Sequence, residues 1–352
     1  MQNQEPYVND DMKLIRPSVV ALHPYIPGEQ LHVEGLIKLN TNENPYPPSP
    51  RVDEVVRSLS VESLRLYPDP LATELRAVIA DLHRCKVENV FVGNGSDETL
   101  ALCTRAFVPP NGAVASFDPS YSLYPVLSAI ADAPMKLLPL ADDFSWTEPP
   151  ADVAPLFFLT TPNAPTGTMY PREKVEAFCK TFQGVVVLDE AYADFAPDNF
   201  MDVALSLPNV LVSRTLSKSY SLAGIRLGYA VGPTPLIEAL NKIRDSYNVN
   251  APTQRIGAAA LRDQTWMRTN AQKIIATREN TADALRVRGW NVFPSATNFL
   301  FARPLAASAA DLMQHLRANK ILVRHFSAPR INDYLRITIG SDEQMQAFLA
   351  AI

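Results

Sequence analysis

The sequence predicts an α/β protein: a large domain with a mostly parallel sheet between helices, and a small α+β domain at the C-terminus. Three short apolar runs, at residues 156–159, 185–188 and 210–212, belong to a pattern in which strands alternate with helices. Unbroken apolar strands of this length are typical of parallel sheets buried on both faces. After Gly232 longer helices are followed by strands mixed with helices, which predicts the second domain. A chain of 352 residues is long enough for both domains.

The first half of the chain predicts alternating helices and strands. Helices are expected at 51–59 and 71–85, the second with apolar residues 71, 75, 78, 79 and 82 on one face. A strand at 89–92 leads into a helix that begins near Ser96, and a strand at 113–117, a helix at 122–132 and a strand at 135–139 follow. Pro171 suits the first turn of the next helix, at 171–182.

The second half predicts the small domain. Helices are expected at 233–247 and, with no proline to interrupt it, at 253–287. Strands are expected at 291–294, 299–302, 321–324 and in the run YLRITIG, with helices at 309–319 and from about Ser341 onward. The start of the chain is rich in Pro and Asn and predicts an extended arm. The expected division is an N-terminal arm at 1–45, a large domain at 46–250 and a small domain at 251–352.

Composition and charge argue against several classes of protein. A net charge of -5, with no stripe of Lys and Arg, disfavours nucleic acid as a partner. The five histidines form no ligand pattern, so no metal is expected. The polar, acidic N-terminus is unlike a signal peptide and no apolar run could cross a membrane, so we expect a cytoplasmic protein without a membrane partner. Cys85, Cys103 and Cys179 are scattered and odd in number, which indicates a reducing compartment.

Polar side chains follow each of the three buried strands. Asn163 comes after the first, Asp189 and Tyr192 after the second, and Lys218 after the third. Ligands of parallel α/β sheets bind beyond the carboxyl ends of the strands, so these side chains are expected to converge on one crevice. Alone, Asp189 is more easily explained as a helix cap or an ion-pair partner. Together, the acid, amide, phenol and lysine match the ring nitrogen, ring hydroxyl and aldehyde of pyridoxal phosphate.

Lys218 stands among small hydroxyls and eight residues before Arg226. Burial and neighbouring positive charge lower the pKa of a lysine and make its amine a nucleophile. Ser217 and Thr215, together with Arg226, are suited to hold a phosphate. Without these neighbours, a surface lysine on a loop would be the better explanation. With them, a chemical role is favoured.

A second phosphate-binding feature is predicted in the segment GNGSD. Glycines followed by Ser96 and Asp97 at the start of a helix leave backbone N–H groups free at the positive end of the helix dipole. Glu98 stands where a third glycine would complete a dinucleotide-binding motif, so a dinucleotide is disfavoured. An ordinary helix capped by Ser96 or Asp97 explains the segment about equally well.

Five further side chains are candidates that also have a structural explanation. Tyr121 is suited to stack on a flat ring or to fill the core, and packing explains Tyr25 and Tyr67. Arg324 and Arg336 lie in predicted strands rich in β-branched residues. An arginine there is costly unless it is paired or binds an anion. A salt bridge is a fair alternative for Arg324, and Arg336 is the stronger anion-binding candidate.

Five segments together resemble a known family: GNGSDE, TTPNAPTG, DEAYADF, SRTLSKSYSLAGIRLG and YLRITIG. They are similar to the histidinol-phosphate aminotransferase branch of the fold type I pyridoxal phosphate enzymes, from about residue 22 to the C-terminus. The resemblance implies that the large domain binds the cofactor and that Lys218 is the Schiff-base lysine. It also implies that Asp189 pairs with the ring nitrogen and that Asn163 and Tyr192 hold the ring's phenolic oxygen.

The resemblance further implies how the rest of the cofactor and the substrate are held. Tyr121 would stack on the ring, and the phosphate would be bound by Ser96, Asp97, Ser217 and Arg226. Tyr67 of the partner subunit would reach the same phosphate, so a homodimer is expected. Tyr25 and Arg324 would lie near the substrate, and Arg336 would bind its phosphate or carboxylate. One departure is Ala164, where many relatives carry a second asparagine, which affects how that loop is held more than it affects Asn163.

The resemblance therefore implies amino transfer from histidinol phosphate to 2-oxoglutarate, which gives imidazole acetol phosphate and glutamate in histidine biosynthesis. The motifs are more specific for the cofactor and the reaction than for the substrate. An aromatic amino-acid aminotransferase and a threonine-phosphate decarboxylase of the same fold are the alternative enzymes. A binding protein without activity is a different class of function, and the presence of Lys218 and Asp189 argues against it.

Overall fold

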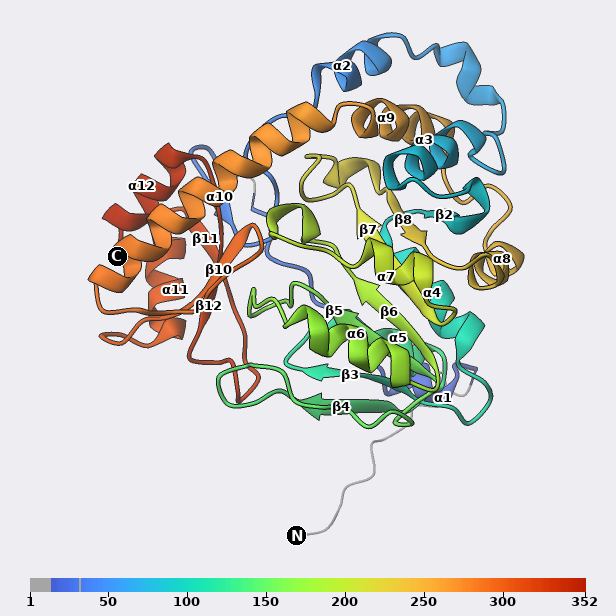
Figure 1. The fold of residues 1–352 in the computed structure, drawn as a ribbon. Coiled ribbons are helices and arrows are strands. Elements are labelled where there is room, and N and C mark those ends of the chain that lie inside the picture. The colour runs from blue at the N-terminus through green and yellow to red at the C-terminus, as the bar shows by residue number, and fades with distance from the viewer. Residues whose placement is uncertain (1–13, 32) are drawn as a thin grey trace.

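A computed structural model describes residues 14–31 and 33–352, which form two sheets with helices around them (Figure 1). The larger sheet has seven strands in the order β2-β8-β7-β6-β5-β3-β4. Their bounds are Val90–Gly93 (β2), Val114–Asp118 (β3), Met135–Pro139 (β4), Leu156–Thr160 (β5), Val185–Asp189 (β6), Val210–Thr215 (β7) and Gly228–Val231 (β8). Every strand that the sequence predicts before β8 is therefore present.

The large sheet is mostly parallel, which confirms the predicted fold class. The strands from β7 to β4 run parallel to their neighbours. Only β8 is antiparallel to the strands on both of its sides, β7 and β2. This strand was not predicted, because four residues directly after the lysine segment are too few to show a strand period.

Helices cover both faces of the large sheet, and the burial of β5 explains why its sequence is apolar throughout. Leu156 and Phe158 share a cluster with α4, α5 and α8, whereas Phe157 and Leu159 share one with α3, α6 and α7. Successive residues of a strand point to opposite faces, so both sets must be apolar. The helices are Thr73–His83 (α3), Ser96–Phe107 (α4), Leu123–Ile130 (α5), Arg172–Thr181 (α6), Met201–Ser206 (α7) and Thr234–Ile243 (α8).

The smaller sheet has five strands in the order β1-β11-β12-β10-β9. Its elements are Ile37–Leu39 (β1), Asn291–Val292 (β9), Phe299–Arg303 (β10), Ile321–His325 (β11) and Leu335–Thr338 (β12), with helices Ala309–Ala318 (α11) and Asp342–Ala350 (α12). The strand β1 comes from the predicted arm and pairs in parallel with β11. Three residues carry no strand signal of their own, so β1 was not predicted. Residues 1–13 of the arm lie outside the described residues.

One predicted helix is wrong. The segment 253–287 was expected to be continuous, but it forms two helices, Ala251–Leu261 (α9) and Gln264–Val287 (α10). The break lies at Arg262 and Asp263, where the Asp263 side chain accepts a hydrogen bond from the backbone N–H of Trp266 and so starts a new helix. Towards the N-terminus, two shorter helices are Pro17–Val20 (α1) and Pro50–Arg57 (α2). Figure 1 shows α10 running from the side of α9 to the small sheet.

Other general features of the described residues can be stated briefly. The three cysteines are free, with Cys103 and Cys179 buried and Cys85 partly buried. Within residues 14–31 and 33–352, no helix combines the length and the apolar character needed to cross a bilayer. The same residues contain no group of three His, Cys, Asp or Glu side chains placed to hold a metal ion.

Candidate active site

The carboxyl ends of β5, β6 and β7 lie side by side, and the predicted polar residues follow them. Thr160 at the end of β5 is in register with Asp189 at the end of β6. Asp189 is in register with Ser213 in β7. Because Asn163 and Lys218 follow β5 and β7 within three residues, the three chain segments leave the sheet at one edge.

Asp189 is buried with one carboxylate oxygen unused. Only 3% of the residue is exposed, and Tyr124 OH donates to its Oδ2 at 2.8 Å. Its Oδ1 has no hydrogen-bond partner among the described residues. Burial raises the pKa of the carboxyl to about 6, and the hydrogen bond from Tyr124 opposes this rise. A buried carboxylate with a free oxygen is suited to receive a cationic N–H donor.

Lys218 is partly buried and its amine has a weak partner. Its Nζ donates to the backbone oxygen of Thr41 at 3.3 Å and lies 5.9 Å from the ring centre of Tyr192. Burial lowers the pKa of the lysine to about 8, and the positive charge of Arg336 adds to the effect. At pH 7, about one Lys218 in ten is therefore unprotonated, against about one in 3,000 for an ordinary lysine.

The four predicted phosphate-binding side chains lie close together at the N-terminus of α4. Gly95 precedes the helix with a φ of 83°, and Ser96 and Asp97 form its first turn. Arg226 Nη2 donates to Asp97 Oδ2 at 3.3 Å, and its Nη1 is 3.5 Å from Ser217 Oγ. Free backbone N–H groups, a guanidinium and a hydroxyl thus surround one spot, as phosphate binding requires.

Gly228 allows β8 to approach this helix start, a role that the sequence did not indicate. A Cβ at Gly228 would lie 2.4 Å from the backbone nitrogen of Ser96 and 2.5 Å from the carbonyl carbon of Gly95. Backbone atoms cannot give way as a flexible side chain can, so any larger residue would push the start of α4 outward.

Asn163 and Tyr192 are both buried beside the strand ends. Asn163 Nδ2 donates to Pro119 O at 3.1 Å and to Thr166 Oγ1 at 3.0 Å. Both hydrogens of this amide are therefore used within the protein, and a ligand oxygen would have to replace one acceptor. Tyr192 OH accepts a hydrogen bond from Asn42 Nδ2 at 2.9 Å.

Tyr121 connects the helix start to the N-terminal arm. Its hydroxyl lies 3.4 Å from Asp97 Oδ1, and its ring meets the ring of Tyr25 edge to face, with 6.0 Å between the ring centres. Burial raises the pKa of Tyr121, so it stays protonated at neutral pH. The structure thus brings Tyr25, Tyr121 and the phosphate-binding group to one region.

Arg324 and Arg336 face each other across β11 and β12. Arg336 Nη2 donates to Asn40 O at 3.1 Å, and Arg324 donates to the backbone oxygens of Ile26 and Pro27 at 3.1 and 3.3 Å. Arg336 Nε is buried without a partner among the described residues. No carboxylate of that part of the chain forms a hydrogen bond with either guanidinium, so the salt-bridge alternative for Arg324 finds no partner. Two adjacent, uncompensated cations favour an anion between or beside them.

Tyr67 is the predicted site residue that lies apart. It is 81% exposed and stacks on Tyr247, with 4.5 Å between the ring centres. No hydrogen bond or aromatic contact of the described residues joins Tyr67 to another predicted site residue within this chain.

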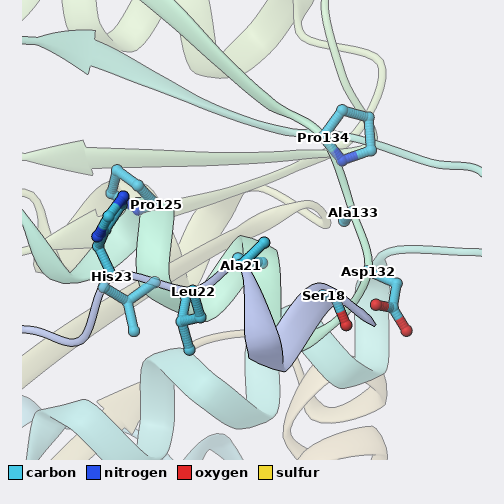
Figure 2. A pocket seen from close by; sticks show the side chains of 10 residues that line it. Ser18, Ala21, Leu22, His23, Pro125, Asp132, Ala133 and Pro134 are labelled. Carbon is cyan, nitrogen blue, oxygen red and sulfur yellow. The ribbon is translucent and has the colours of Figure 1, made fainter. Parts of the chain in front are cut away.

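A pocket elsewhere on the surface contains none of the predicted residues. It lies between α1 and α5 (Figure 2). It is lined by Ser18, Ala21, Leu22, His23, Pro125, Val126, Ala129, Asp132, Ala133 and Pro134. The predicted site residues therefore lie outside this pocket.

The sequence pattern of one protein family, described as aminotransferase class I and II, matches residues 34–352. The chain belongs to this aminotransferase family. It is 44% identical to the histidinol-phosphate aminotransferase of Synechocystis sp. over 97% of this chain and 98% of that protein. It is 43% identical to the histidinol-phosphate aminotransferase of Chromohalobacter salexigens over 97% and 98%.

Solved structures agree with this membership. Histidinol-phosphate aminotransferase from Sinorhizobium meliloti, solved in complex with pyridoxal-5'-phosphate, has a TM-score of 0.84 and 26% identity, with 95% of each chain covered. L-threonine-O-3-phosphate decarboxylase from Porphyromonas gingivalis has a TM-score of 0.80 at 22% identity, and covers 90% of this chain and 98% of that one. The second likeness shows the shared fold alone.

The residues of this aminotransferase fit pyridoxal phosphate. The free buried oxygen of Asp189 suits a protonated ring nitrogen, and the amine of Lys218, with its lowered pKa, suits an aldehyde. The start of α4 with Arg226 suits the phosphate. Tyr124 and Thr160 were not predicted as site residues, although their oxygens lie 2.6 Å apart and Tyr124 also donates to Asp189. Their only signal was position, since both lie at strand ends or helix starts on the same edge of the sheet.

Proposed function

We propose that this aminotransferase moves an amino group from histidinol phosphate to 2-oxoglutarate, giving imidazole acetol phosphate and glutamate in histidine biosynthesis. The observation that carries the proposal is the pair Arg324 and Arg336, two adjacent guanidiniums without a carboxylate partner in the described part of the chain. Relatives that are 43% and 44% identical over nearly the whole chain carry the name histidinol-phosphate aminotransferase, which supports the same substrate.

When bound, pyridoxal phosphate supplies an aldehyde that takes up the amino group and a ring that accepts the electrons released at the substrate carbon. Lys218 would hold the cofactor at this aldehyde, and its amine, whose pKa burial lowers, would be the base that moves a proton at the substrate carbon. Asp189 would accept a hydrogen bond from the ring nitrogen at its free Oδ1 and so favour the protonated ring. Tyr192 and Asn163 would hold the ring oxygen, and Tyr121 would stack on the ring.

The anion-binding groups divide between cofactor and substrate. Ser96, Asp97, Ser217 and Arg226 hold the cofactor phosphate at the start of α4. Arg324 and Arg336 bind the substrate phosphate in one half of the reaction and a carboxylate of 2-oxoglutarate in the other, because a guanidinium fork binds either anion. Tyr25 closes the site over the substrate through its contact with Tyr121.

A homodimer completes the site in this proposal. Exposed apolar residues lie near Tyr67 in the chain or stack on it, and their burial by a second copy of the chain would be favourable. These residues are Val61, Leu64, Leu66, Leu71 and Tyr247. In the proposed dimer, Tyr67 reaches the cofactor phosphate of the other subunit. Free, scattered cysteines support a cytoplasmic location.

The decisive experiment is single-turnover bleaching of the visible band of the cofactor-loaded enzyme with histidinol phosphate, phenylalanine or threonine phosphate. Rapid bleaching by histidinol phosphate, with formation of imidazole acetol phosphate, supports the proposal. Faster bleaching by phenylalanine would move the substrate to aromatic amino acids, and release of carbon dioxide from threonine phosphate would make the enzyme a decarboxylase. The matched control is Lys218→Ala, which should show neither the band nor turnover; steady turnover by this variant would refute the role of Lys218.

A further inference from the structure

Asn42 is a buried residue to which the proposed reaction has given no role. It is 1% exposed and has a φ of 57°, in the left-handed region that asparagine tolerates better than most residues. Its Nδ2 donates to Tyr192 OH at 2.9 Å, and its backbone oxygen accepts from Asn298 Nδ2 at 2.9 Å. Asn42 therefore joins the N-terminal arm to the phenol that faces the cofactor site.

Thr338 of β12 fixes which way the Asn42 amide points. The backbone N–H of Asn42 donates to Thr338 Oγ1 at 3.0 Å, and Thr338 Oγ1 lies 3.0 Å from Asn42 Oδ1. A hydroxyl has one hydrogen, and here that hydrogen is donated to Oδ1. With the amide turned over, this buried hydroxyl hydrogen would lose its acceptor, at a cost of about 1–3 kcal/mol. Oδ1 thus faces Thr338, and the N–H group faces Tyr192.

The direction of the hydrogen bond between Asn42 and Tyr192 determines whether the Tyr192 hydroxyl can donate its hydrogen to a ligand. Because the Tyr192 oxygen accepts from Asn42, its own hydrogen has to point elsewhere. Within residues 14–31 and 33–352, no acceptor receives that hydrogen. Tyr192 also has the Lys218 amine over its ring, 5.9 Å from the ring centre, so the phenol belongs to the wall of the proposed cofactor site.

We propose that Asn42, oriented by Thr338, is a positioning residue that makes Tyr192 a hydrogen-bond donor to the ring oxygen of pyridoxal phosphate. The inference rests on the proposed function, since it concerns the cofactor that function requires. Hydrogen bonds in a chain polarise one another, so the amide also makes the phenol a stronger donor. The hydrogen bond from Asn42 counteracts the rise in the pKa of Tyr192 that burial causes, which agrees with this polarisation.

The consequence is a measurable shift in the cofactor's absorption. A donor on the ring oxygen stabilises negative charge there, and that negative charge holds the proton of the neighbouring lysine nitrogen. Losing the donor leaves the oxygen more negative, so the pKa at which the visible band changes should rise. A neutral hydrogen bond contributes about 1 kcal/mol, which corresponds to a rise in this pKa of about 1.

The test compares Thr338→Val with Thr338→Ser by pH titration of the visible band of the loaded enzyme. The valine variant lacks the hydroxyl that orients Asn42, so the amide is free to turn and take the Tyr192 hydrogen. We expect its band pKa to rise by about 1 and that of the serine variant to stay within a few tenths of the wild-type value. A residue with a merely structural role would lower the melting temperature without moving this pKa.

Two further variants test the same hydrogen bond between Asn42 and Tyr192. Tyr192→Phe should raise the band pKa, and adding Thr338→Val to it should cause no further rise, because the two changes act through one hydrogen bond. Asn42→Gly removes the amide but suits the left-handed backbone. Tyr192 then loses only the donor that polarises it, so the band pKa should rise by less than in Tyr192→Phe; this variant serves as the test if Thr338→Val fails to fold. An unchanged pKa in Thr338→Val, or an equal rise in the Tyr192→Phe background, would overturn the inference alone. A wild-type protein without a visible band would overturn the proposed function as well.

Discussion

Asp189→Asn should make the cofactor-free protein more stable and the cofactor-loaded protein less active. Burial raises the pKa of Asp189 from 3.8 to about 6, so ionising it at pH 7 costs the folded protein about 3 kcal/mol. Asparagine carries no charge and still accepts the hydrogen bond from Tyr124. Its amide group takes the place of the unpartnered oxygen and is itself unpartnered, which costs about 1 kcal/mol. The expected net gain for the cofactor-free variant is therefore about 2 kcal/mol.

The assay is urea unfolding of the cofactor-free wild type and variant between pH 4 and pH 7.5. Because its pKa is raised on folding, protonated Asp189 contributes stability to the folded protein. This stability is fully present below pH 3.8 and is lost as the pH rises through about 6. Asp189→Asn should thus be no more stable than the wild type at pH 4 and reach its full advantage by about pH 7. Adding pyridoxal phosphate should stabilise the wild type more than the variant, because a cationic ring nitrogen removes the cost of the charge. A difference that is absent, or the same at every pH, would refute this account of Asp189.

Three further predictions test other parts of the site. The rate at which the cofactor-free protein forms the visible band should rise with pH and level off above about 8, the pKa to which burial lowers Lys218; a rise that continues to pH 10.5 would contradict this. Gly228→Ala should lower stability by about 1–3 kcal/mol and weaken the binding of both pyridoxal phosphate and free phosphate, measured by calorimetry; unchanged binding would show that the start of α4 does not move. Tyr67→Glu should shift the protein towards monomer in sedimentation experiments, whereas Tyr67→Phe should keep the dimer and weaken only cofactor binding.

The fold was predictable where strands are buried on both faces of the sheet. The unbroken apolar runs of β5, β6 and β7 could not serve a helix or an exposed strand, so they specified a parallel core. The strands β1 and β8 were missed because each obtains its hydrogen bonds from partners distant in sequence and is too short to show a pattern. The break before α10 was missed because Asp263 looks like any exposed polar residue until its side chain is seen to cap a helix.

The candidate site was predictable where a residue follows a strand. Strand order alone brings Asp189, the segment after β5 and the segment after β7 to one edge. Residues that contact the site without following one of these strands could not be recognised in this way. Tyr124 reaches Asp189 from a helix face, and Gly228 acts by having no side chain. Asn42 lies in the arm rich in Pro and Asn, but its orienting role depends on Thr338, nearly 300 residues further along, so the sequence did not predict that role.

The pairing of β1 with β11 has a consequence for synthesis of the protein. Ile37 of β1 pairs with Ile321 of β11, which is synthesised roughly 280 residues later. The small sheet can therefore form only when the last part of the chain has been made. The large sheet, with Lys218 and Asp189, is finished earlier. Asp189 and Lys218 are therefore synthesised before Arg324 and Arg336, and β1 has no partner strand β11 during that interval. Slowing translation after β8 should lengthen this vulnerable period and raise the demand for chaperones.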